Sequence, residues 1–309
     1  MSARLSPRGL AAAAAAFSLW GLFPIYLHPL SGVPALQVIA QRVSWSCVFL
    51  LGWMLLRGEL GRLTLTLARP ALLARLMLTA CLISCNWLVY VWSVTHAHIV
   101  DTSLGYYINP LVNVLLGVLV LRERLNRAQW TAVTLAALAV LYLALLAGRP
   151  LWIAGTLALS FSLYGFLRKV ISVDALPGLA TETLLLAPLA VGYLLWCEAA
   201  GSGALGHSGA AVDALLVGSG LVTAVPLALF AYGARALPYS TVGVLQYIAP
   251  SLQLVCGVLL YHESFGPAMV AGFALLWLGL AIYAVDGWRQ TRQALRASPG
   301  SASPGSVSR

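Results

Sequence analysis

Long apolar stretches, separated by short polar segments, recur along the whole chain. A helix needs about 20 mostly apolar residues to cross the hydrocarbon core of a bilayer. Ten stretches have this character: 9–28, 34–56, 71–94, 101–121, 126–147, 150–170, 177–198, 211–234, 239–260 and 265–286. They are far too long for barrel strands, and backbone groups in lipid must bond internally. The pattern therefore predicts an all-α integral membrane protein with ten transmembrane helices.

The first stretch begins after Arg4 and Arg8, as the apolar part of a secretory signal peptide would. It continues through Trp20, Pro24 and Tyr26, and no small-residue cleavage site ends it. We therefore expect this stretch to be retained as the first transmembrane helix.

Short segments of the first half recur in the second half. Tyr107–Pro110 matches Tyr247–Pro250 at an offset of 140, and Phe17–Gly21 matches Phe161–Gly165 at an offset of 144. Each half contains five predicted helices, and because five is odd the second copy crosses the membrane in the opposite sense. The pattern predicts two inverted five-helix repeats, whose halves can exchange inward-open and outward-open states. A gene duplication without a transport role is the alternative.

Composition agrees with a lipid environment. Hydrophobic residues make up 61% of the chain and charged residues 9%, whereas soluble globular domains carry about 25% charged residues. The five cysteines all fall in predicted spans, and no Cys–His cluster has the spacing of a zinc site. No phosphate-binding loop of the G-x-x-x-x-G-K-[ST] type is present. We expect no metal or cofactor, and no direct use of ATP.

The net charge of +9 is distributed as in a membrane protein and does not indicate a nucleic-acid partner. If the ten helices are numbered in order, 16 of the 18 basic residues fall in the N-terminus, the even-to-odd loops and the C-terminal tail. These are Arg4, Arg8, Arg57, Arg62, Arg69, Arg75, Arg122, Arg124, Arg127, Arg168, Lys169, Arg235, Arg289, Arg292, Arg296 and Arg309. Arg149 lies on the opposite side and Arg42 within a span. Both termini are therefore expected in the cytoplasm.

The expected organisation has four parts. A short cytoplasmic N-terminus, 1–8, precedes the first repeat, 9–147, and the second, inverted repeat covers 150–286. The tail, 287–309, is basic and then rich in Ser, Pro and Gly, so we expect it to be disordered.

Two ionisable residues lie well inside predicted spans, where charge is costly and is a hypothesis of function by default. Arg42 lies about eight residues into the second stretch, and Glu182 is its counterpart at the offset of 140. An arginine near the middle of a helix costs about 2.5–3.5 kcal/mol on insertion scales. Three interpretations are open: an ion pair between Arg42 and Glu182, an arginine that binds a carboxylate or phosphate of a substrate beside a protonatable glutamate, or snorkelling to the interface.

Other polar and aromatic residues at membrane depth are candidates to line a central cavity, or to bond neighbouring helices. With Arg42, the candidate substrate-binding residues are Trp45, Asn86, Trp87, Tyr106, Tyr107, Asn109, Tyr164, Gln246 and Tyr247. Pro110 and Pro250, within the fourth and ninth stretches, each remove a backbone donor and are expected to kink these helices. Glu123 and Glu263, which follow the same two stretches, are expected to cap helix ends or loops.

An intramembrane enzyme is the main alternative from another class. It would need a catalytic set such as Ser/His, paired Asp or zinc ligands, and none is recognisable. His96 and His98, followed by Asp101, form a short outer loop that is a weak metal signal. For a carrier driven by protons, Glu182 or Asp101 is the candidate coupling residue.

Several segments resemble RarD-type members of the drug/metabolite transporter superfamily, also called the EamA family. The resemblance covers residues 8–288 and rests on motifs that occur in order. These are Arg42-Val43-x-Trp45-Ser46, Asn86-Trp87-Leu88, Ser103-Leu104-Gly105-Tyr106-x-Ile108-Asn109-Pro110-Leu111, Tyr164-Gly165-x-x-Arg168-Lys169, Glu182-Thr183, Val225-Pro226-Leu227 and Ser240-Thr241-x-Gly243-x-x-Gln246-Tyr247-Ile248-x-Pro250.

This resemblance implies a ten-helix permease of the bacterial inner membrane whose relatives mostly export amino acids and other metabolites, or move drugs. One departure is Gln41, where the family pattern has a histidine beside the arginine, which puts any proton coupling through that histidine in doubt here. We expect a secondary transporter, with a small molecule, the lipid bilayer and protons as partners, that exports a small amphipathic metabolite or drug. An importer or a lipid-linked flippase of the same fold is the alternative.

Overall fold

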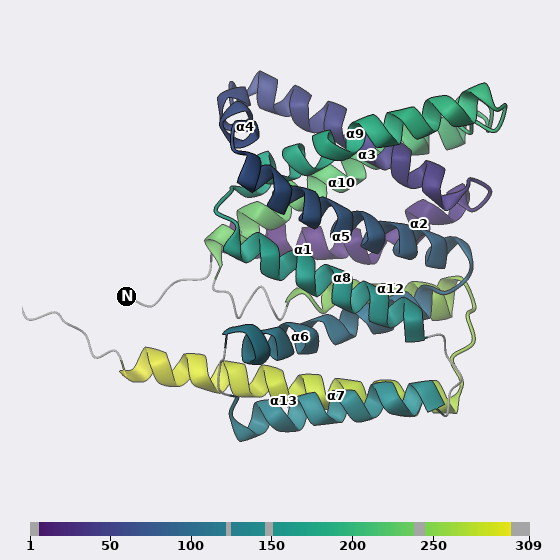
Figure 1. Ribbon diagram of the computed structural model, residues 1–309. Helices are drawn as coiled ribbons and strands as arrows, with labels where there is room; N and C mark the ends of the chain where they lie inside the picture. Colours follow the sequence, from purple (N-terminus) through teal and green to yellow (C-terminus); the bar gives the residue numbers. More distant parts are fainter. Residues whose placement is uncertain (1–5, 122–124, 146–150, 238–244, 298–309) are drawn as a thin grey trace, which may run out of the picture.

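The computed structural model describes residues 6–121, 125–145, 151–237 and 245–297, and all regular secondary structure in these ranges is helical. Most helices run in one common direction, horizontal in Figure 1. In chain order they are α1 (Pro7–Gly21), α2 (Phe23–Leu27), the 3₁₀ turn η1 (His28–Leu30), α3 (Ala35–Leu56), α4 (Leu60–Leu67), α5 (Pro70–Thr95), α6 (Ile99–Leu121), α7 (Arg127–Leu145), α8 (Leu151–Val170), α9 (Ala175–Ala199), α10 (Ala210–Ala236), α12 (Ile248–Val255), the π-helical turn η2 (Cys256–Leu260) and α13 (Pro267–Ala297).

The prediction of an all-helical membrane protein is confirmed. Within the described ranges, six helices are long and apolar enough to cross a membrane, or seven if the bent pair formed by α1 and α2–η1 counts as one span. The six are Ala35–Leu56, Pro70–Thr95, Leu151–Arg168, Leu176–Ala199, Ala210–Phe230 and Pro267–Asp286. Two shorter apolar helices, Arg127–Leu143 and Ile248–Leu260, also fall in predicted stretches.

The structure departs from the sequence pattern at several helix boundaries. The first stretch is bent by 44° between α1 and α2, next to Pro24. α4 is an additional short helix between the second and third stretches. The tail is helical as far as Ala297, because residues 287–297 contain strong helix formers such as Gln, Leu, Ala and Arg, and basic side chains near a helix C-terminus are favourable. Residues 298–309 lie outside the described ranges.

The two prolines expected to kink helices differ from each other. α6 is helical without a break past position 110. The ninth stretch is interrupted by a turn at Gln246–Tyr247, and α12 begins only at Ile248. Pro250 therefore lies in the first turn of α12, where a missing backbone N–H is tolerated.

The helices pack around two main apolar cores. The larger core combines buried residues of α2, α3, α5, α8, α9 and α10, and the other combines residues of α6, α7, α12 and α13. α13 packs along α7 at the bottom of Figure 1, and α8 lies between α5 and α6. Residues adjacent in sequence can belong to different cores: Tyr106 packs against the larger core and Tyr107 is buried in the other.

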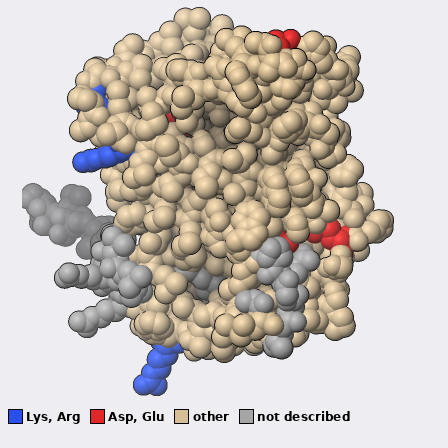
Figure 2. All heavy atoms as spheres, turned by 45° about the vertical axis from the view of Figure 1, so that its right-hand side comes forward, with Lys and Arg blue, Asp and Glu red and all other residues tan. Residues whose placement is uncertain are grey.

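The two ends of the bundle differ in charge. At the end that we call the basic end, Arg62 forms a salt bridge of 4.0 Å with Asp174, and Asn126 donates a hydrogen bond of 2.7 Å to Asp286. The opposite end holds the loops that contain His98, Glu198 and Glu263. Figure 2 shows blue atoms toward one side of the molecule, red atoms mostly toward the other, and an almost charge-free surface between them.

Contacts at the opposite end join loops that are distant in sequence. The ring of His28 stacks on Tyr261 at 4.5 Å. The Gln37 side chain donates to the Ser202 carbonyl at 2.8 Å and accepts from the Ala204 amide at 3.0 Å. The loops therefore gather into two groups, which agrees with the grouping expected from the basic residues.

Glu263 caps a helix to which it is not connected in sequence. Its carboxylate oxygens accept hydrogen bonds from the backbone amides of Ile99, at 2.6 Å, and Val100, at 2.9 Å, in the first turn of α6. A negative charge at this position satisfies free amides and interacts favourably with the helix dipole. The expectation that Glu263 caps a helix end is confirmed, while Glu123 lies outside the described residues.

This cap gives a stability prediction. Replacing Glu263 with Ala leaves two amides at the start of α6 without their acceptor, so we expect a loss of about 1 kcal/mol or more. The apparent midpoint of thermal unfolding in detergent should fall by a few degrees. Glu59→Ala is the matched control, because Glu59 occupies the N-cap position of α4 and its side chain makes no cap hydrogen bond there. Equal midpoints for the two variants would contradict the capping role.

Candidate functional site

Arg42 is buried in the interior of the larger core, seven residues after the start of α3. Its side chain is 5% exposed, and its Nε donates a hydrogen bond of 2.6 Å to the hydroxyl of Thr223 on α10. The guanidinium carbon lies 4.8 Å from the centre of the Phe23 ring and 4.3 Å from that of Trp87. Cation–π contacts of this kind stabilise a buried guanidinium. In the described part of the chain, no carboxylate lies within 4.0 Å of it.

A series of aromatic rings extends from this arginine. Phe23 stacks on Tyr26 at 5.6 Å and on Tyr90 at 5.8 Å, and Tyr90 lies 5.8 Å from Tyr106. Tyr106 in turn meets Phe161 of α8 edge to face at 5.9 Å. The series joins α2, α5, α6 and α8 around one interior region.

Asn86 organises the polar contacts in this region. Its side-chain nitrogen donates to the Leu157 carbonyl at 3.1 Å and to the Ser160 hydroxyl at 3.0 Å. Its oxygen accepts from the Tyr106 hydroxyl at 3.1 Å. Both polar atoms of the buried amide are bonded to other helices, through two donated and one accepted hydrogen bond, which is the bonding role expected for some polar residues at membrane depth.

Glu182 forms a second buried charged cluster, on α9. Its carboxylate accepts a hydrogen bond of 2.7 Å from Thr79 and one of 3.3 Å from Tyr164, and it lies 3.8 Å from Nη1 of Arg168. The side chain is 1% exposed. Among the open interpretations, the ion pair between Arg42 and Glu182 is therefore wrong: Glu182 pairs with Arg168.

The separation of Arg42 and Glu182 has a simple geometric reason. Each lies seven residues after the first residue of its helix, Ala35 or Ala175. A rise of 1.5 Å per residue places each about 10 Å from its helix start. α3 begins at the opposite end of the bundle and α9 at the basic end, so the two charges occupy different depths. Snorkelling of Arg42 to the interface is also excluded by its burial in the core.

The two clusters are connected through stripes on α5 and α8. Thr79, Ile83, Asn86 and Tyr90 follow one another at intervals of three or four residues on α5, and Ser160, Tyr164 and Arg168 do so on α8. Such spacing places side chains on one helix face. The helices pack against each other, and their polar groups form a column from the surroundings of Arg42 to those of Glu182.

Asn109 lies one turn after Tyr106 on α6. Its side chain is fully buried, and neither its oxygen nor its nitrogen has a hydrogen-bond partner among the described residues. Ser162 of α8 donates to its backbone carbonyl at 3.3 Å. An unpaired buried amide is costly, by about 1–3 kcal/mol for each unsatisfied group, which marks this position as a candidate contact for water or solute.

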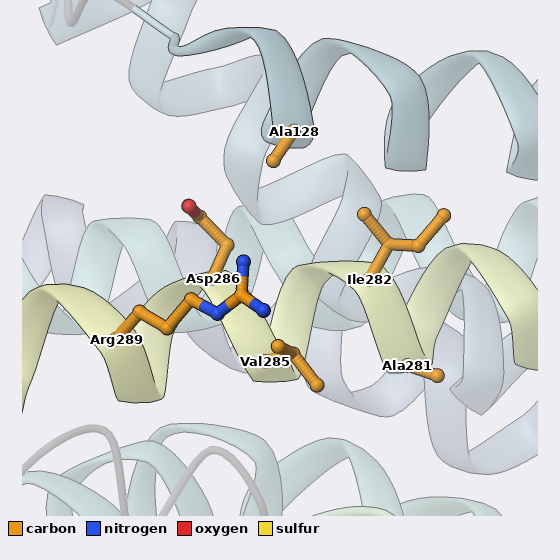
Figure 3. A pocket seen from close by; sticks show the side chains of 6 residues that line it. All are labelled: Ala128, Ala281, Ile282, Val285, Asp286 and Arg289. Atoms are coloured by element: carbon orange, nitrogen blue, oxygen red, sulfur yellow. The ribbon is translucent and has the colours of Figure 1, made fainter.

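Tyr107 and Tyr247 do not join this column. They line a groove of about 440 Å³ between α6, α12 and α13, together with Ser251 and Trp277. The Tyr107 hydroxyl is 2.7 Å from that of Ser251, and the two tyrosine rings stack at 6.3 Å. A second groove, of about 310 Å³, lies at the basic end between Ala128 of α7 and residues of α13, among them Ile282, Asp286 and Arg289 (Figure 3).

The remaining candidates have local partners. Trp45 donates a hydrogen bond of 3.0 Å from its Nε1 to the side-chain oxygen of Gln41. Gln41, the residue that departs from the family pattern, therefore binds the Trp45 side chain. Asp101 is buried in the first turn of α6, 3.0 Å from Nδ1 of His98. Gln246 lies half-buried in the turn before α12.

Several residues of the two clusters were not among the sequence-based candidates: Phe23, Thr79, Tyr90, Arg168 and Thr223. Thr79 and Tyr90 share a helix face with Asn86, and this spacing could have identified them. Arg168 was counted as a basic residue of a loop and belongs to a motif of the family resemblance, but it was not proposed as a site residue. Thr223 and Phe23 carry no comparable signal, because their importance comes from contact with Arg42 between different helices, in the case of Thr223 across 181 residues.

Comparison with known proteins identifies the family. Residues 7–145 match the EamA-like transporter family. The chain is 43% identical to the protein RarD of Streptomyces exfoliatus, over 90% of this chain and 88% of that protein. It is 41% identical to an uncharacterized transporter of Pseudomonas aeruginosa (93% and 96% covered) and 34% identical to the chloramphenicol-sensitive protein RarD of the same organism (95% and 99% covered).

Similarity in fold extends to solved structures. One crystal structure superposes with a TM-score of 0.60 over 89% of this chain and 96% of that chain, at 19% identity, and this likeness concerns the fold alone. The Pseudomonas aeruginosa relative at 41% identity is named a transporter, and none of the relatives reported above is named as an enzyme. The chain is a multi-pass membrane protein that belongs to the EamA-like transporter family, as a RarD-type permease.

Proposed function

We propose that this permease is a secondary transporter that exports a small amphipathic metabolite or drug, and that Arg42 binds an anionic group of the solute. The observation that carries the proposal is the arginine itself. It is buried between two aromatic rings, and no described carboxylate neutralises it. An intramembrane charge of this kind is costly and is retained where it has a function.

The geometry around Arg42 suits a carboxylate or phosphate. Phe23 and Trp87 hold the guanidinium, and Thr223 occupies its Nε. The two terminal nitrogens make no hydrogen bond to other described residues. A planar guanidinium whose terminal nitrogens are free can bind an oxyanion through two parallel hydrogen bonds. The adjacent rings of Tyr26, Tyr90 and Tyr106 would contact an apolar part of the same solute.

The pairing of helices supports the proposed ten-helix architecture of two inverted repeats. If α1, α3, α5, α6 and α7 correspond to α8, α9, α10, α12 and α13, the most extensive contacts each have a counterpart, although the smaller α3–α5 contact has none of similar size between the described residues of α9 and α10. The α1–α10 contact corresponds to α5–α8, α3–α10 to α5–α9, and α6–α8 to α1–α12. The pairs α3–α9, α6–α12 and α7–α13 are their own counterparts. These pairings are those of a pseudo-two-fold axis, about which carriers alternate access.

In this proposal the column between α5 and α8 is part of the solute pathway. Arg42 lies near the opposite end and Glu182 near the basic end, and the buried amides of Asn86 and Asn109 lie at intermediate depth. A solute bound near Arg42 would be released as the repeats rearrange. The distribution of basic residues supports a cytoplasmic location for the basic end and both termini, in a protein that we propose lies in the bacterial inner membrane.

Energy coupling by protons is part of the proposal. Glu182 and Asp101 are buried carboxyl groups near opposite ends of the bundle. Glu182 contacts the column through Tyr164, whereas Asp101 contacts His98 in a loop. Glu182 is therefore the preferred coupling residue.

Transport assays of Arg42 variants test the function. Cells that express the wild type, Arg42→Ala, Arg42→Lys or no protein would be compared by profiling metabolites in cells and medium. Chloramphenicol would be added as a second probe because of the name of one relative. We expect one class of compound to accumulate outside only with the wild type. Arg42→Ala should reduce its export by about 30-fold or more, since truncating one partner of a buried charge pair costs at least about 2 kcal/mol.

Arg75→Ala is the matched control for this experiment. It removes the same charge from an exposed position on α5, so export should be unchanged. Arg42→Lys keeps the charge without the planar fork and should be intermediate. Wild-type export by Arg42→Ala would exclude the binding role, and accumulation inside the cells would indicate import. Identical profiles in all strains would argue against metabolite export.

Glu182→Gln tests the coupling residue. Glutamine keeps hydrogen-bonding positions for Thr79 and Tyr164 but cannot release a proton. In proteoliposomes loaded with the solute identified above, we expect solute exchange to persist and the response to an imposed pH gradient to disappear. Asp101→Asn is the comparison variant and should retain the response. A pH-gradient response that survives in Glu182→Gln and disappears in Asp101→Asn would transfer the coupling role to Asp101.

A further inference from the structure

The corner between α8 and α9 closes the basic end of the column. α8 ends at Val170 and α9 begins at Ala175, so only four residues join them. Arg168, in the last turn of α8, extends across this corner. Its Nη1 lies 3.8 Å from the Glu182 carboxylate, and its Nη2 donates to the backbone carbonyl of Asp174 at 3.4 Å.

Gly178 provides the surface over which Arg168 reaches Glu182. It is buried in the first turn of α9, four residues before Glu182 and therefore on the same helix face. A Cβ atom at this position would overlap with the Nη1, Nη2 and Cζ atoms of Arg168. The guanidinium thus lies directly against the backbone of α9, and a Cβ at position 178 would displace it from its present place.

The Arg168–Glu182 pair has further polar contacts on both sides. Toward the interior, Thr79 and Tyr164 donate to the same carboxylate. Toward the basic end, Asp174, whose carbonyl accepts from Arg168, forms an exposed salt bridge with Arg62. The side chain of Arg168 is 14% exposed and that of Glu182 is 1% exposed. Because both charges are largely removed from water, separating them without a replacement partner is costly.

We propose that the Arg168–Glu182 pair is a gate that closes the solute pathway at the basic end, and that Gly178 is the residue that positions Arg168 in it. This inference rests on the proposed alternating-access transport and adds the element that holds one access route shut. Opening the gate requires Arg168 to leave the face of α9. Protonation of Glu182, or a solute cation in place of the guanidinium, would lower the cost of opening.

Labelling of a cysteine behind the gate tests this proposal without any solute. Ser160, two turns before Arg168 on the same face of α8, is buried and close in size to cysteine. Ser160→Cys would be introduced into the full chain with its five native cysteines replaced by alanine. A charged, membrane-impermeant methanethiosulfonate reagent would then be added at the basic end of the protein in oriented vesicles.

We expect Gly178→Ala to accelerate labelling about tenfold or more, since displacing one member of a buried ion pair shifts the equilibrium toward the open state. Gly165→Ala is the matched control. Gly165 lies on α8 in the same region, and a Cβ there would meet no atom within 4 Å, so its labelling rate should equal that of the parent. Labelling of Gly178→Ala at the parent rate would overturn the positioning role.

Charge variants distinguish a gate formed by the ion pair from an effect of packing alone at the corner between α8 and α9. Arg168→Gln should accelerate labelling as Gly178→Ala does, and the exchanged pair Arg168→Glu with Glu182→Arg should return it toward the parent rate. Parent-rate labelling of Arg168→Gln would overturn the gate even if Gly178→Ala failed to fold. The labelling result and the export assay are independent. If export depends on Arg42 but Arg168→Gln and Gly178→Ala are labelled at the parent rate, the gate alone is rejected. If these variants are labelled faster but export does not depend on Arg42, only the transport role is rejected.

Discussion

A hydrocarbon environment cannot replace the hydrogen bonds and ion contacts that water provides, and this constraint governs the whole structure. Backbone groups satisfy it through helices, and each polar side chain in a span must find a partner on another helix. Asn86 does so with both polar atoms, whose partners lie on α6 and α8. Glu182 does so with a hydroxyl on α5 and two groups on α8. These contacts decide how α5, α6, α8 and α9 are arranged.

Against this background, the groups that lack a protein partner are informative. Arg42 is stabilised by two rings and one hydroxyl, and its charge is not neutralised by any described carboxylate. Asn109 is buried, and neither of its side-chain polar atoms has a partner in the described part of the chain. A carrier must hold its solute with groups that can also release it, and incompletely satisfied groups in an otherwise satisfied interior have that property. Glu182 and Arg168 show the contrasting case, because their opposite charges pair with each other. In our proposal this pair closes the solute pathway at the basic end.

Small residues allow the close helix contacts on which this arrangement depends. A Cβ at Gly233 would overlap with Ala13 of α1, and one at Gly220 would overlap with the backbone of α3 at Trp45 and Ser46. Close approach of backbones is a general means of packing helices in membranes, where the hydrophobic effect gives little drive for association. At Gly220 the approach also brings α10 toward α3, the same pair of helices that the hydrogen bond between Thr223 and Arg42 joins.

The sequence by itself determined the helical class, the positions of most helices, the two groups of loops and the exceptional nature of Arg42 and Glu182. Apolar length, charge distribution and the cost of intramembrane charge are local properties that can be read from a chain. The tertiary structure alone decided that Glu182 pairs with Arg168, that Thr223 and Phe23 hold Arg42, and that Tyr106 faces the column while Tyr107 faces another groove. The reason is physical: a helix that is apolar on all sides gives no indication of which face meets which neighbour. Partners on different helices, whether as near in sequence as Arg168 and Glu182 or 181 residues apart as Arg42 and Thr223, are selected only when the helices pack.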